Sequence, residues 1–327
     1  DFEKISGLSN EIKSKLNSIS KNSGKIAFLT STIISPTTEN IIKQFSEKYK
    51  NVTHVQSDSI SYQGILDANL ETFGVRRMPN YYFEKADVIV SFGADFIANW
   101  GGNPNYECNY VKGRNPKSGK MSKHFQIEST LTLTGSNADY RVQIKPSEQS
   151  ILLYNLYNSL KGSSPDPRLK NIVKSLKSSK SSIVLSNSND KRVQLLVNSI
   201  NQMLGNYGST IDMKNYSNLR KGNDNDFDTL VKEMHEGKIK ALITYNINPS
   251  YTSINSQHFN KALSKVGLKI STSMYMDETS SKMDYICPDN HNLESWGDMN
   301  PSYNEYTLMQ PTINPLFDTR QFQSSLL

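Results

Sequence analysis

The sequence predicts an α/β fold of two lobes, each built around a mostly parallel sheet. Short apolar runs alternate with amphipathic segments of about 10 to 15 residues, which is the pattern of parallel strands joined by crossover helices. The chain has 327 residues, which is more than one ordinary core holds. Hydrophobic residues make up 36% of it, with 17 Tyr and 12 Phe, so two packed cores can be filled.

The first lobe is expected to span residues 1–163. Its opening strand is the apolar run at 25–34, and a helix capped by Thr37 or Thr38 follows it. The other elements expected in this lobe are a strand at 51–59, a helix at 62–73, strands at 86–92, 124–130 and 138–146, and a helix at 147–161.

The second lobe is expected to span residues 164–327. GSSPDP at 162–167 is rich in Gly, Ser and Pro, and we interpret it as the linker between the lobes. The chain begins at Asp1 without an initiator Met, and we expect it to be an internal segment of a longer subunit. The elements expected in this lobe are strands at 181–187, 239–249, 268–277 and 284–290, and helices at 192–205, 227–238 and 258–267.

One feature is expected in both lobes, namely a buried strand that runs into a polar turn. ADVIVSFGADF at 86–96 and IKALITYNINP at 239–249 share this pattern. In doubly wound sheets, ligands lie at the carboxyl ends of the strands, so a cofactor is expected at these two turns. The candidate cofactor-side residues are Gly93, Ala94, Asp95, Phe96, Asn246, Asn248 and Pro249.

The net charge of +6 is spread along the chain, which is typical of a solvated surface. No nucleic-acid partner is expected. No stretch approaches the roughly 18 apolar residues of a membrane helix, so no direct membrane span is expected. One basic loop is either an exposed loop or a docking site for an acidic partner or phosphate; it contains Lys112, Arg114, Lys117, Lys120 and Lys123.

Two motifs that suggest nucleotide or metal chemistry are incomplete. GRNPKSGKM at 113–121 has five residues between its glycines where a phosphate loop has four, and Met121 stands where a Ser or Thr must meet magnesium. His291 and Glu294 supply two ligands where a metal site needs three or more, and we expect them to hydrogen-bond within a turn. No catalytic residue and no metal site are predicted.

The chain has two cysteines, Cys108 and Cys287, too few for an iron–sulfur or zinc site built from cysteines alone. We expect both to be packing residues. A disulfide between them requires the two lobes to meet at that point.

An ordered series of motifs resembles the large subunits of the molybdopterin oxidoreductase superfamily. In the second half these are Asn248-Pro249 in KALITYNINPSYT, then DET at 277–279 and LESWG at 293–297. In the first half, ADVIVSFGADF and FQIESTLTLTGSNADYRVQIKPSEQSILLYNL are similar to the family's strand, cofactor-side turn and following helix. The resemblance covers nearly the whole chain from about residue 24, and it implies two Rossmann-like lobes.

FGVRRMPNYYFEKADVIVSFGADFIANW and MSKHFQIESTLTLTGSNADYRV resemble a narrower branch, the iron–sulfur subunit of alternative complex III, a bacterial membrane quinol:electron-acceptor oxidoreductase. The resemblance implies a non-catalytic scaffold without molybdenum cofactor, with [4Fe-4S] and [3Fe-4S] clusters in a separate ferredoxin-like part. It also implies a place on the periplasmic side of the inner membrane. The implied partners are a multihaem cytochrome c, integral membrane quinol-binding subunits and a terminal oxidase.

Three residues at the turns agree with loss of the cofactor. A carboxylate at Asp95 that faced a diphosphate would be repelled by about 1 to 4 kcal/mol. Phe96 adds bulk. Ile247 stands where relatives have Gly, and a β-branched residue poorly tolerates the positive φ that Gly allows. The turns are therefore expected to be empty. The alternative is a catalytic molybdopterin oxidoreductase of the polysulfide or tetrathionate reductase type, with the molybdopterin cofactor near these turns.

Overall fold

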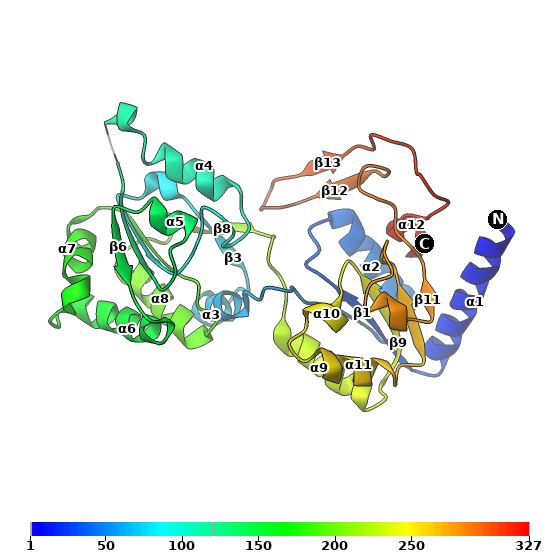
Figure 1. Cartoon of the computed structure of the whole chain (residues 1–327). Coiled ribbons are helices and arrows are strands. Elements are labelled where there is room, and N and C mark those ends of the chain that lie inside the picture. Colours follow the sequence, from blue (N-terminus) through cyan, green and yellow to red (C-terminus); the bar gives the residue numbers. More distant parts are fainter. Residues whose placement is uncertain (1, 120, 327) are drawn as a thin grey trace. The chain divides into compact units, whose positions relative to one another are not determined.

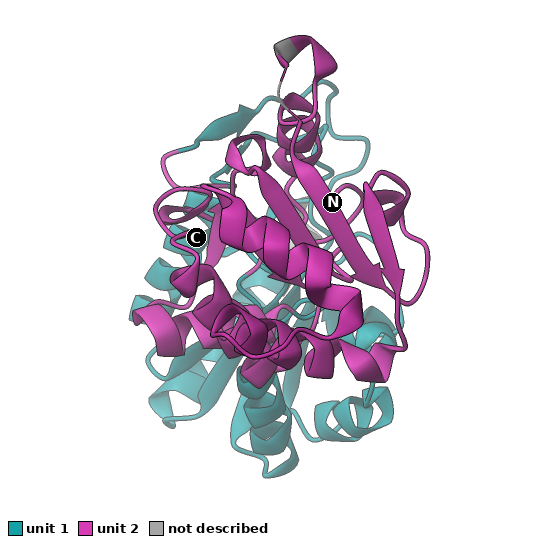
Figure 2. Ribbon diagram, turned by 90° about the vertical axis from the view of Figure 1, so that its left-hand side faces the viewer, with its two compact units in different colours: residues 1–61, 221–301, 305–327 teal, residues 62–220, 302–304 magenta. Residues whose placement is uncertain are grey.

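The computed structural model describes residues 2–119 and 121–326, which form two compact units. Unit 1 consists of Asp1–Ser61, Lys221–Pro301 and Glu305–Leu327. Unit 2 consists of Tyr62–Arg220 and Ser302–Asn304. Figure 1 shows the elements of the chain, and Figure 2 shows the two units in different colours.

Unit 1 contains a five-stranded parallel sheet in the order β11-β10-β9-β1-β2. Its strands are β1 (Lys25–Thr30), β2 (Val52–Gln56), β9 (Ile239–Tyr245), β10 (Leu268–Ser271) and β11 (Tyr285–Ile286). Its helices are α1 (Phe2–Lys21), α2 (Pro36–Lys48), α9 (Asp224–His235), α10 (Pro249–Thr252), α11 (Ser256–Leu263) and α12 (Phe322–Leu326). A small antiparallel hairpin, β12 (Gly297–Met299) with β13 (Thr307–Met309), completes the unit.

Both faces of the unit 1 sheet are covered, because successive residues of β1 enter different cores. Ile26 and Phe28 pack in a cluster with residues of α1, α2 and α12. Ala27 and Leu29 pack in a second cluster with residues of α9 and α11. This explains why the strand is a continuous apolar run in the sequence rather than an alternating one.

Unit 2 contains a four-stranded parallel sheet in the order β6-β5-β4-β7. Its strands are β4 (Val88–Phe92), β5 (Lys123–Glu128), β6 (Tyr140–Gln143) and β7 (Ser182–Ser186). β3 (Met78–Tyr81) and β8 (Ile211–Ser217) form an antiparallel pair. Its helices are α3 (Gln63–Phe73), α4 (Asn105–Lys112), α5 (Leu133–Ser136), α6 (Gln149–Leu160), α7 (Lys170–Ser178) and α8 (Lys191–Met203).

The predicted α/β fold with two Rossmann-like lobes and mostly parallel sheets is confirmed. The expected boundary between residues 163 and 164 is wrong, because β1 and β2 pair into one sheet with β9 and β10, and β7 pairs with β4. GSSPDP at 162–167 is a turn between α6 and α7 of one unit, where the Asp166 side chain accepts a hydrogen bond from the Arg168 N–H. Gly, Ser and Pro mark tight turns as readily as linkers.

Three smaller expectations can be compared with the structure. The cap of α2 is Ser35, whose hydroxyl accepts from the Thr38 N–H at 3.0 Å, rather than Thr37 or Thr38. Within the described ranges, no helix is long and apolar enough to cross a membrane. In the basic loop, Arg114 forms a bidentate ion pair with Asp139, in which both nitrogen–oxygen distances are 2.8 Å. Lys120 of this loop lies outside the described residues.

Candidate functional site

The first candidate turn follows β4 and depends on the backbone freedom of Gly93. This residue has φ +70°, and its N–H donates to the Ile127 carbonyl at 2.8 Å. A Cβ at this position would lie 2.7 Å from Oδ1 of Asn187, so a larger residue would have to displace that side chain. The positive φ and the close approach of Asn187 both favour glycine here.

Asp95 and Phe96 of this turn serve unit 2 itself. The Asp95 carboxylate accepts hydrogen bonds from the Thr134 N–H at 3.0 Å and the Thr134 hydroxyl at 2.7 Å. Phe96 is 3% exposed and stacks on Phe83 with the ring centroids 4.2 Å apart. The expectation that Phe96 adds bulk to a ligand site is therefore wrong, because its ring packs inside unit 2. The Asp95 carboxylate keeps its charge at the turn, and Thr134 holds it in place.

The second candidate turn follows β9. Asn246 has φ +51°, and its amide donates to the Ser31 hydroxyl at 3.1 Å. The argument that Ile247 cannot form the turn is wrong, because the positive φ falls on Asn246, which tolerates it well. Ile247 instead packs against the core cluster shared by α9 and α11.

Asn248 holds the second turn against the segment that follows β10. Its side-chain oxygen accepts from the Thr279 N–H at 3.1 Å and from the Thr279 hydroxyl at 2.6 Å. Its amide nitrogen donates to the Glu278 carboxylate at 2.7 Å. An amide is required at this position, since a carboxylate here would face Glu278 with no proton to donate.

The two turns are equivalent position by position. Gly93 and Asn246 carry the positive φ directly after the strand. Asp95 and Asn248, each three residues past its strand, hold the N–H and hydroxyl of a threonine that follows the next strand of the sheet. We call each of these side-chain pairs, Asp95 with Thr134 and Asn248 with Thr279, a clasp. The repeat suspected from the sequence therefore extends to side-chain contacts.

These residues fit a polyanionic pterin dinucleotide poorly. Such a ligand favours free N–H donors and cationic side chains. The clasps instead use their polar side chains internally, and each brings a carboxyl group, Asp95 in one and Glu278 in the other. The hydrogen bond from Asn248 lowers the pKa of Glu278, so this group is ionised at neutral pH.

A row of buried polar side chains along β5 was missed from the sequence. His124, Gln126 and Glu128 are 0%, 0% and 3% exposed, and they share one face of the strand because alternate residues point the same way. His124 lies 3.3 Å from the Gln126 oxygen, and Gln126 donates to Glu128 at 3.1 Å. The signal was present in HFQIE, where polar and apolar residues alternate in a strand expected to be buried.

The row ends in a dense set of donors around Glu128. Its carboxylate accepts from Arg141 at 2.7 Å and from the N–H and hydroxyl of Thr132 at 3.2 and 2.7 Å. Burial raises the pKa of Glu128, but the hydrogen bonds from Arg141, Thr132 and Gln126 outweigh burial and leave that pKa below its usual value. Burial lowers the pKa of His124 to about 4, so its ring is neutral at pH 7.

The other residues singled out from the sequence do not form a site. The His291 N–H donates to the Glu294 carboxylate at 2.9 Å, which confirms the expected turn. Cys287 packs against the unit 1 core, whereas Cys108 is exposed on α4, so the expectation of packing is wrong for Cys108. Both thiols are free. In the described part of the chain, no group of three or more His, Cys, Asp or Glu side chains could hold a metal ion.

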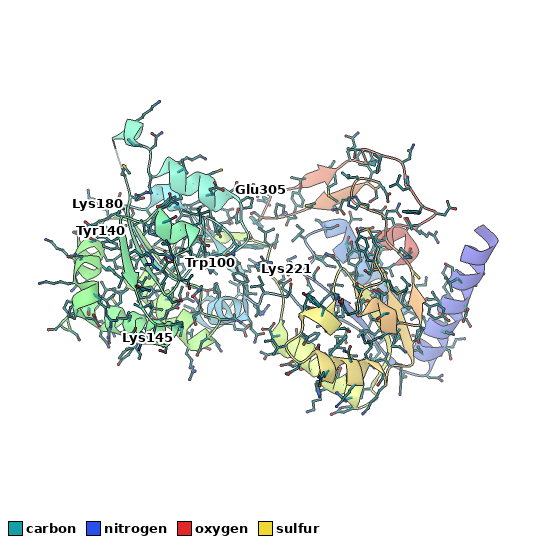
Figure 3. The ribbon with its side chains drawn as sticks, in the orientation of Figure 1. Trp100, Tyr140, Lys145, Lys180, Lys221 and Glu305 are labelled. Atoms are coloured by element: carbon teal, nitrogen blue, oxygen red, sulfur yellow. The ribbon has the colours of Figure 1, made fainter. Side chains whose placement is uncertain are left out.

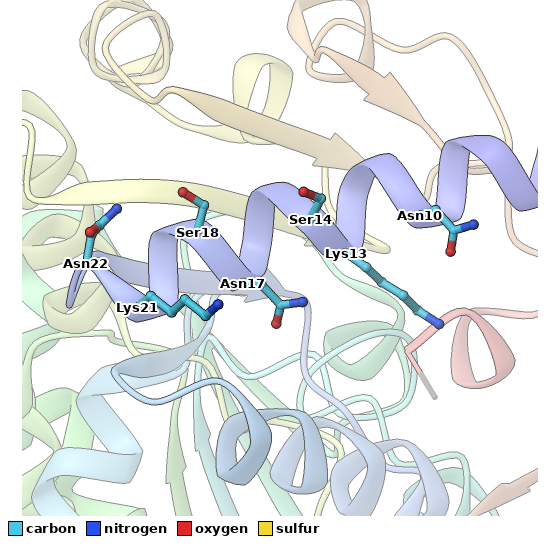
Figure 4. Close-up of a pocket in the computed structure, with 7 residues that line it drawn as sticks. All are labelled: Asn10, Lys13, Ser14, Asn17, Ser18, Lys21 and Asn22. Atoms are coloured by element: carbon cyan, nitrogen blue, oxygen red, sulfur yellow. The ribbon is translucent and has the colours of Figure 1, made fainter.

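A surface depression of about 550 Å³ lies along α1 and not at the turns. It is lined by one helix and the residue after it, and Figure 4 shows these side chains along α1; they are Asn10, Lys13, Ser14, Asn17, Ser18, Lys21 and Asn22. A single helix face does not enclose a ligand, so this depression is not a binding site.

Comparison with known proteins supports the superfamily resemblance. No protein-family model matches the chain. Over 92 residues the chain is 32% identical to the menaquinone reductase, molybdopterin-binding-like subunit, of Nitratidesulfovibrio vulgaris, a match that covers 27% of this chain and 13% of that protein.

Two solved structures share the fold. Acetylene hydratase from Pelobacter acetylenicus superposes with a TM-score of 0.73 at 12% identity, covering 98% of this chain and 57% of that one. The formyltransferase/hydrolase complex from Methylorubrum extorquens, in complex with methylofuran, gives a TM-score of 0.67 at 10% identity, covering 96% and 94%. The chain therefore has a molybdopterin oxidoreductase-like fold, and the partial match to the menaquinone reductase subunit agrees with this superfamily.

Proposed function

We propose that this chain is a non-catalytic scaffold, the molybdopterin-oxidoreductase-like domain of the iron–sulfur subunit of alternative complex III. In that role it carries no molybdenum cofactor and lies on the periplasmic side of the bacterial inner membrane. The complex oxidises membrane quinol and passes electrons through clusters and haems in neighbouring domains. This domain keeps those parts at fixed separations, on which electron transfer depends.

The observation that carries the proposal is the pair of clasps. At both turns where this fold would bind a cofactor, the polar side chain three residues past the strand is bound to a threonine of the same unit. A cofactor that bonded to these polar atoms would have to displace the threonine hydrogen bonds, each of which contributes about 1 kcal/mol. The Asn248 clasp uses residues of motifs that the superfamily shares, so the Asp95 clasp is the one that distinguishes this chain. The same contacts tie neighbouring strands together, which suits a scaffold.

The partial match to a molybdopterin-binding-like subunit of a menaquinone reductase supports the quinone-linked setting. The proposed partners are a multihaem cytochrome c, integral membrane quinol-binding subunits and a terminal oxidase. The [4Fe-4S] and [3Fe-4S] clusters belong in this proposal to a ferredoxin-like part of the subunit. A catalytic molybdopterin oxidoreductase of the polysulfide or tetrathionate reductase type is the competing function.

Substitutions in the clasps distinguish an effect on assembly of the complex from an effect on quinol oxidation. Asn248→Asp removes the amide donor and places a second carboxylate beside Glu278, so we expect about threefold less assembled complex in membranes. Quinol oxidation per assembled complex is expected to stay unchanged, because a scaffold touches no reacting group. The measurement is complex content by quantitative immunoblot together with turnover in the same membranes.

The matched control is Asp95→Asn, which keeps an oxygen that can accept from Thr134 as Asn248 does from Thr279. Its complex content is expected to match the wild type. Normal assembly of Asn248→Asp with turnover reduced per complex would favour the catalytic alternative.

A further inference from the structure

Residues 293–301 and 305–317 of unit 1 expose an unusual amount of apolar surface. Seven large hydrophobic side chains in these two stretches are 44% to 80% exposed; these are Leu293, Trp296, Tyr306, Leu308, Ile313, Leu316 and Phe317. We call these seven residues the apolar layer. Single exposed hydrophobic residues are ordinary on a protein surface, but seven in two paired stretches indicate an interaction site.

Backbone hydrogen bonds hold the segment together, so the stretches that carry the seven residues lie side by side. The Leu293 carbonyl accepts from the Thr312 and Ile313 N–H groups at 2.8 and 3.1 Å. The Leu316 N–H donates to the Glu294 carboxylate at 3.1 Å. β12 and β13 pair between these two stretches, so residues 293–299 and 307–316 run side by side.

The segment is also fixed to the body of unit 1. The Asp298 carboxylate accepts from the Thr37 hydroxyl at 2.7 Å, and also from the Ser35 hydroxyl at the start of α2. The Asn300 N–H donates to the Ile34 carbonyl at 2.7 Å, and the Gln321 amide donates to the Trp296 carbonyl at 2.7 Å. A surface anchored in this way is ordered before a partner binds, which reduces the entropy lost on binding.

The charge of the segment is opposite to that of the chain. Residues 293–317 contain Glu294, Asp298 and Glu305 and no Lys or Arg, so their formal charge is −3 where the whole chain has +6. Glu305 is exposed, and Figure 3 labels it. Hydrogen bonds from the His291 and Leu316 N–H groups lower the pKa of Glu294, so its charge persists at neutral pH.

We propose that the apolar layer docks a different protein subunit, through an apolar face of that partner rimmed by Lys and Arg. The exposed aromatic and aliphatic side chains supply the contact area, and the exposed Glu305 with the net negative charge of the segment favours a basic rim. This inference deepens the proposed function, since it names the docking surface and the chemistry of its partner, and it rests on that function for the existence of the complex.

The negative charge of the segment argues against three other binding partners: an anionic membrane, a nucleic acid and a second copy of this chain. An anionic membrane surface or a nucleic acid would be repelled by three carboxylates with no cation among them. A symmetric dimer of this chain would bring two identical surfaces together and place −3 against −3. A basic, apolar face on another protein meets neither penalty.

Hydroxyl-radical footprinting tests the docking surface directly. Oxidation of Trp296, Tyr306, Leu308 and Phe317 is measured in the isolated chain and in the complex purified from native membranes. We expect at least about fivefold lower oxidation of these residues in the complex, as for side chains at a buried interface core. Equal oxidation in both samples would overturn the proposal.

A pair of double variants tests the contribution of the layer. Leu308→Glu with Phe317→Glu is expected to leave the melting temperature of the isolated chain unchanged, because both side chains are at least 75% exposed. It is expected to reduce the co-purified partner subunits by about tenfold. The matched control, Tyr251→Glu with Ile254→Glu, alters residues that are 74% and 102% exposed elsewhere in unit 1 and is expected to keep the partners.

Other outcomes would overturn the proposal. These are equal loss of partners in the two double variants, a dimer of the isolated chain that Leu308→Glu dissolves, or Leu308-dependent binding to vesicles containing about 30% anionic lipid. Glu305→Lys is expected to weaken partner retention, and a gain in retention would contradict the basic rim. Molybdenum in the complex would contradict the scaffold function, whereas protection of the apolar layer from oxidation would still support the docking surface. Failure of the proposed function and failure of the docking proposal are therefore distinguishable.

Discussion

Glu128→Ala is expected to destabilise unit 2 by about 3 kcal/mol. The carboxylate is 3% exposed and accepts from Arg141, from Gln126 and from two donors of Thr132, so its removal leaves four hydrogen-bond donors without their acceptor. Breaking a buried ion pair from one side costs about 3 to 5 kcal/mol, and the low end applies because the Arg141 side chain is 27% exposed.

The two tryptophans allow the units to be followed separately. Trp100 is buried in unit 2, where Figure 3 labels it, and Trp296 lies in unit 1. A Trp296→Phe background therefore leaves Trp100 as the reporter of unit 2. Urea unfolding of Glu128→Ala is measured by Trp100 fluorescence in that background. Glu71→Ala, which removes an exposed carboxylate paired with Lys191 in the same unit, is the control and is expected to change little. A loss below about 1 kcal/mol for Glu128→Ala would show that the row is not a stabilising network.

Unit 2 is expected to lose stability as the pH falls from 6.5 to 4. Burial lowers the pKa of His124 from 6.5 to about 4, so in this window the unfolded chain binds a proton that the folded unit does not. The stabilising contribution is therefore complete above pH 6.5 and is lost as the pH falls through the folded pKa. The slope is about 1.4 kcal/mol per pH unit, or about 3 kcal/mol in total.

The pH dependence is measured by urea unfolding at several pH values, again with Trp100 as reporter. His124→Gln removes the titrating ring, and its stability is expected to vary less with pH than that of the wild type. His258→Gln changes a histidine of unit 1 and is expected to leave the slope for unit 2 unchanged. An unchanged slope in His124→Gln would contradict the assignment of the pH dependence to His124.

Burial also lowers the pKa of His54 in unit 1 to about 4, so the stability of that unit is expected to fall in acid as well.

Local elements were predictable where the pattern was strong. The helix expected at 62–73 is α3, Gln63–Phe73, and the strand expected at 86–92 contains β4, Val88–Phe92. The division into units was not predictable, because it depends on the pairing of β1 with β9 across about 200 residues of sequence. Apolar runs show that a strand is buried and do not show which strand lies beside it.

A turn does follow each of the two strands, as predicted, but the contacts of the turn side chains were not predictable. A sequence shows that Asp95 follows a strand, and it does not show that Thr134, from beyond the next strand, supplies two donors to it. The positive φ was expected at position 247 and falls on Asn246, one residue earlier. Such one-residue differences depend on how the turn packs, and here Ile247 packs against the core cluster shared by α9 and α11.

We propose above all that this fold acts here as a scaffold without a molybdenum cofactor. The most direct test is elemental analysis of molybdenum and iron, with assay of released pterin, in the full-length subunit purified natively within its membrane complex. The proposed scaffold predicts several iron atoms per complex, molybdenum near zero and no pterin. Molybdenum near one atom per subunit, with pterin released in equal amount, would contradict it and make the two turns the place to look for an active site.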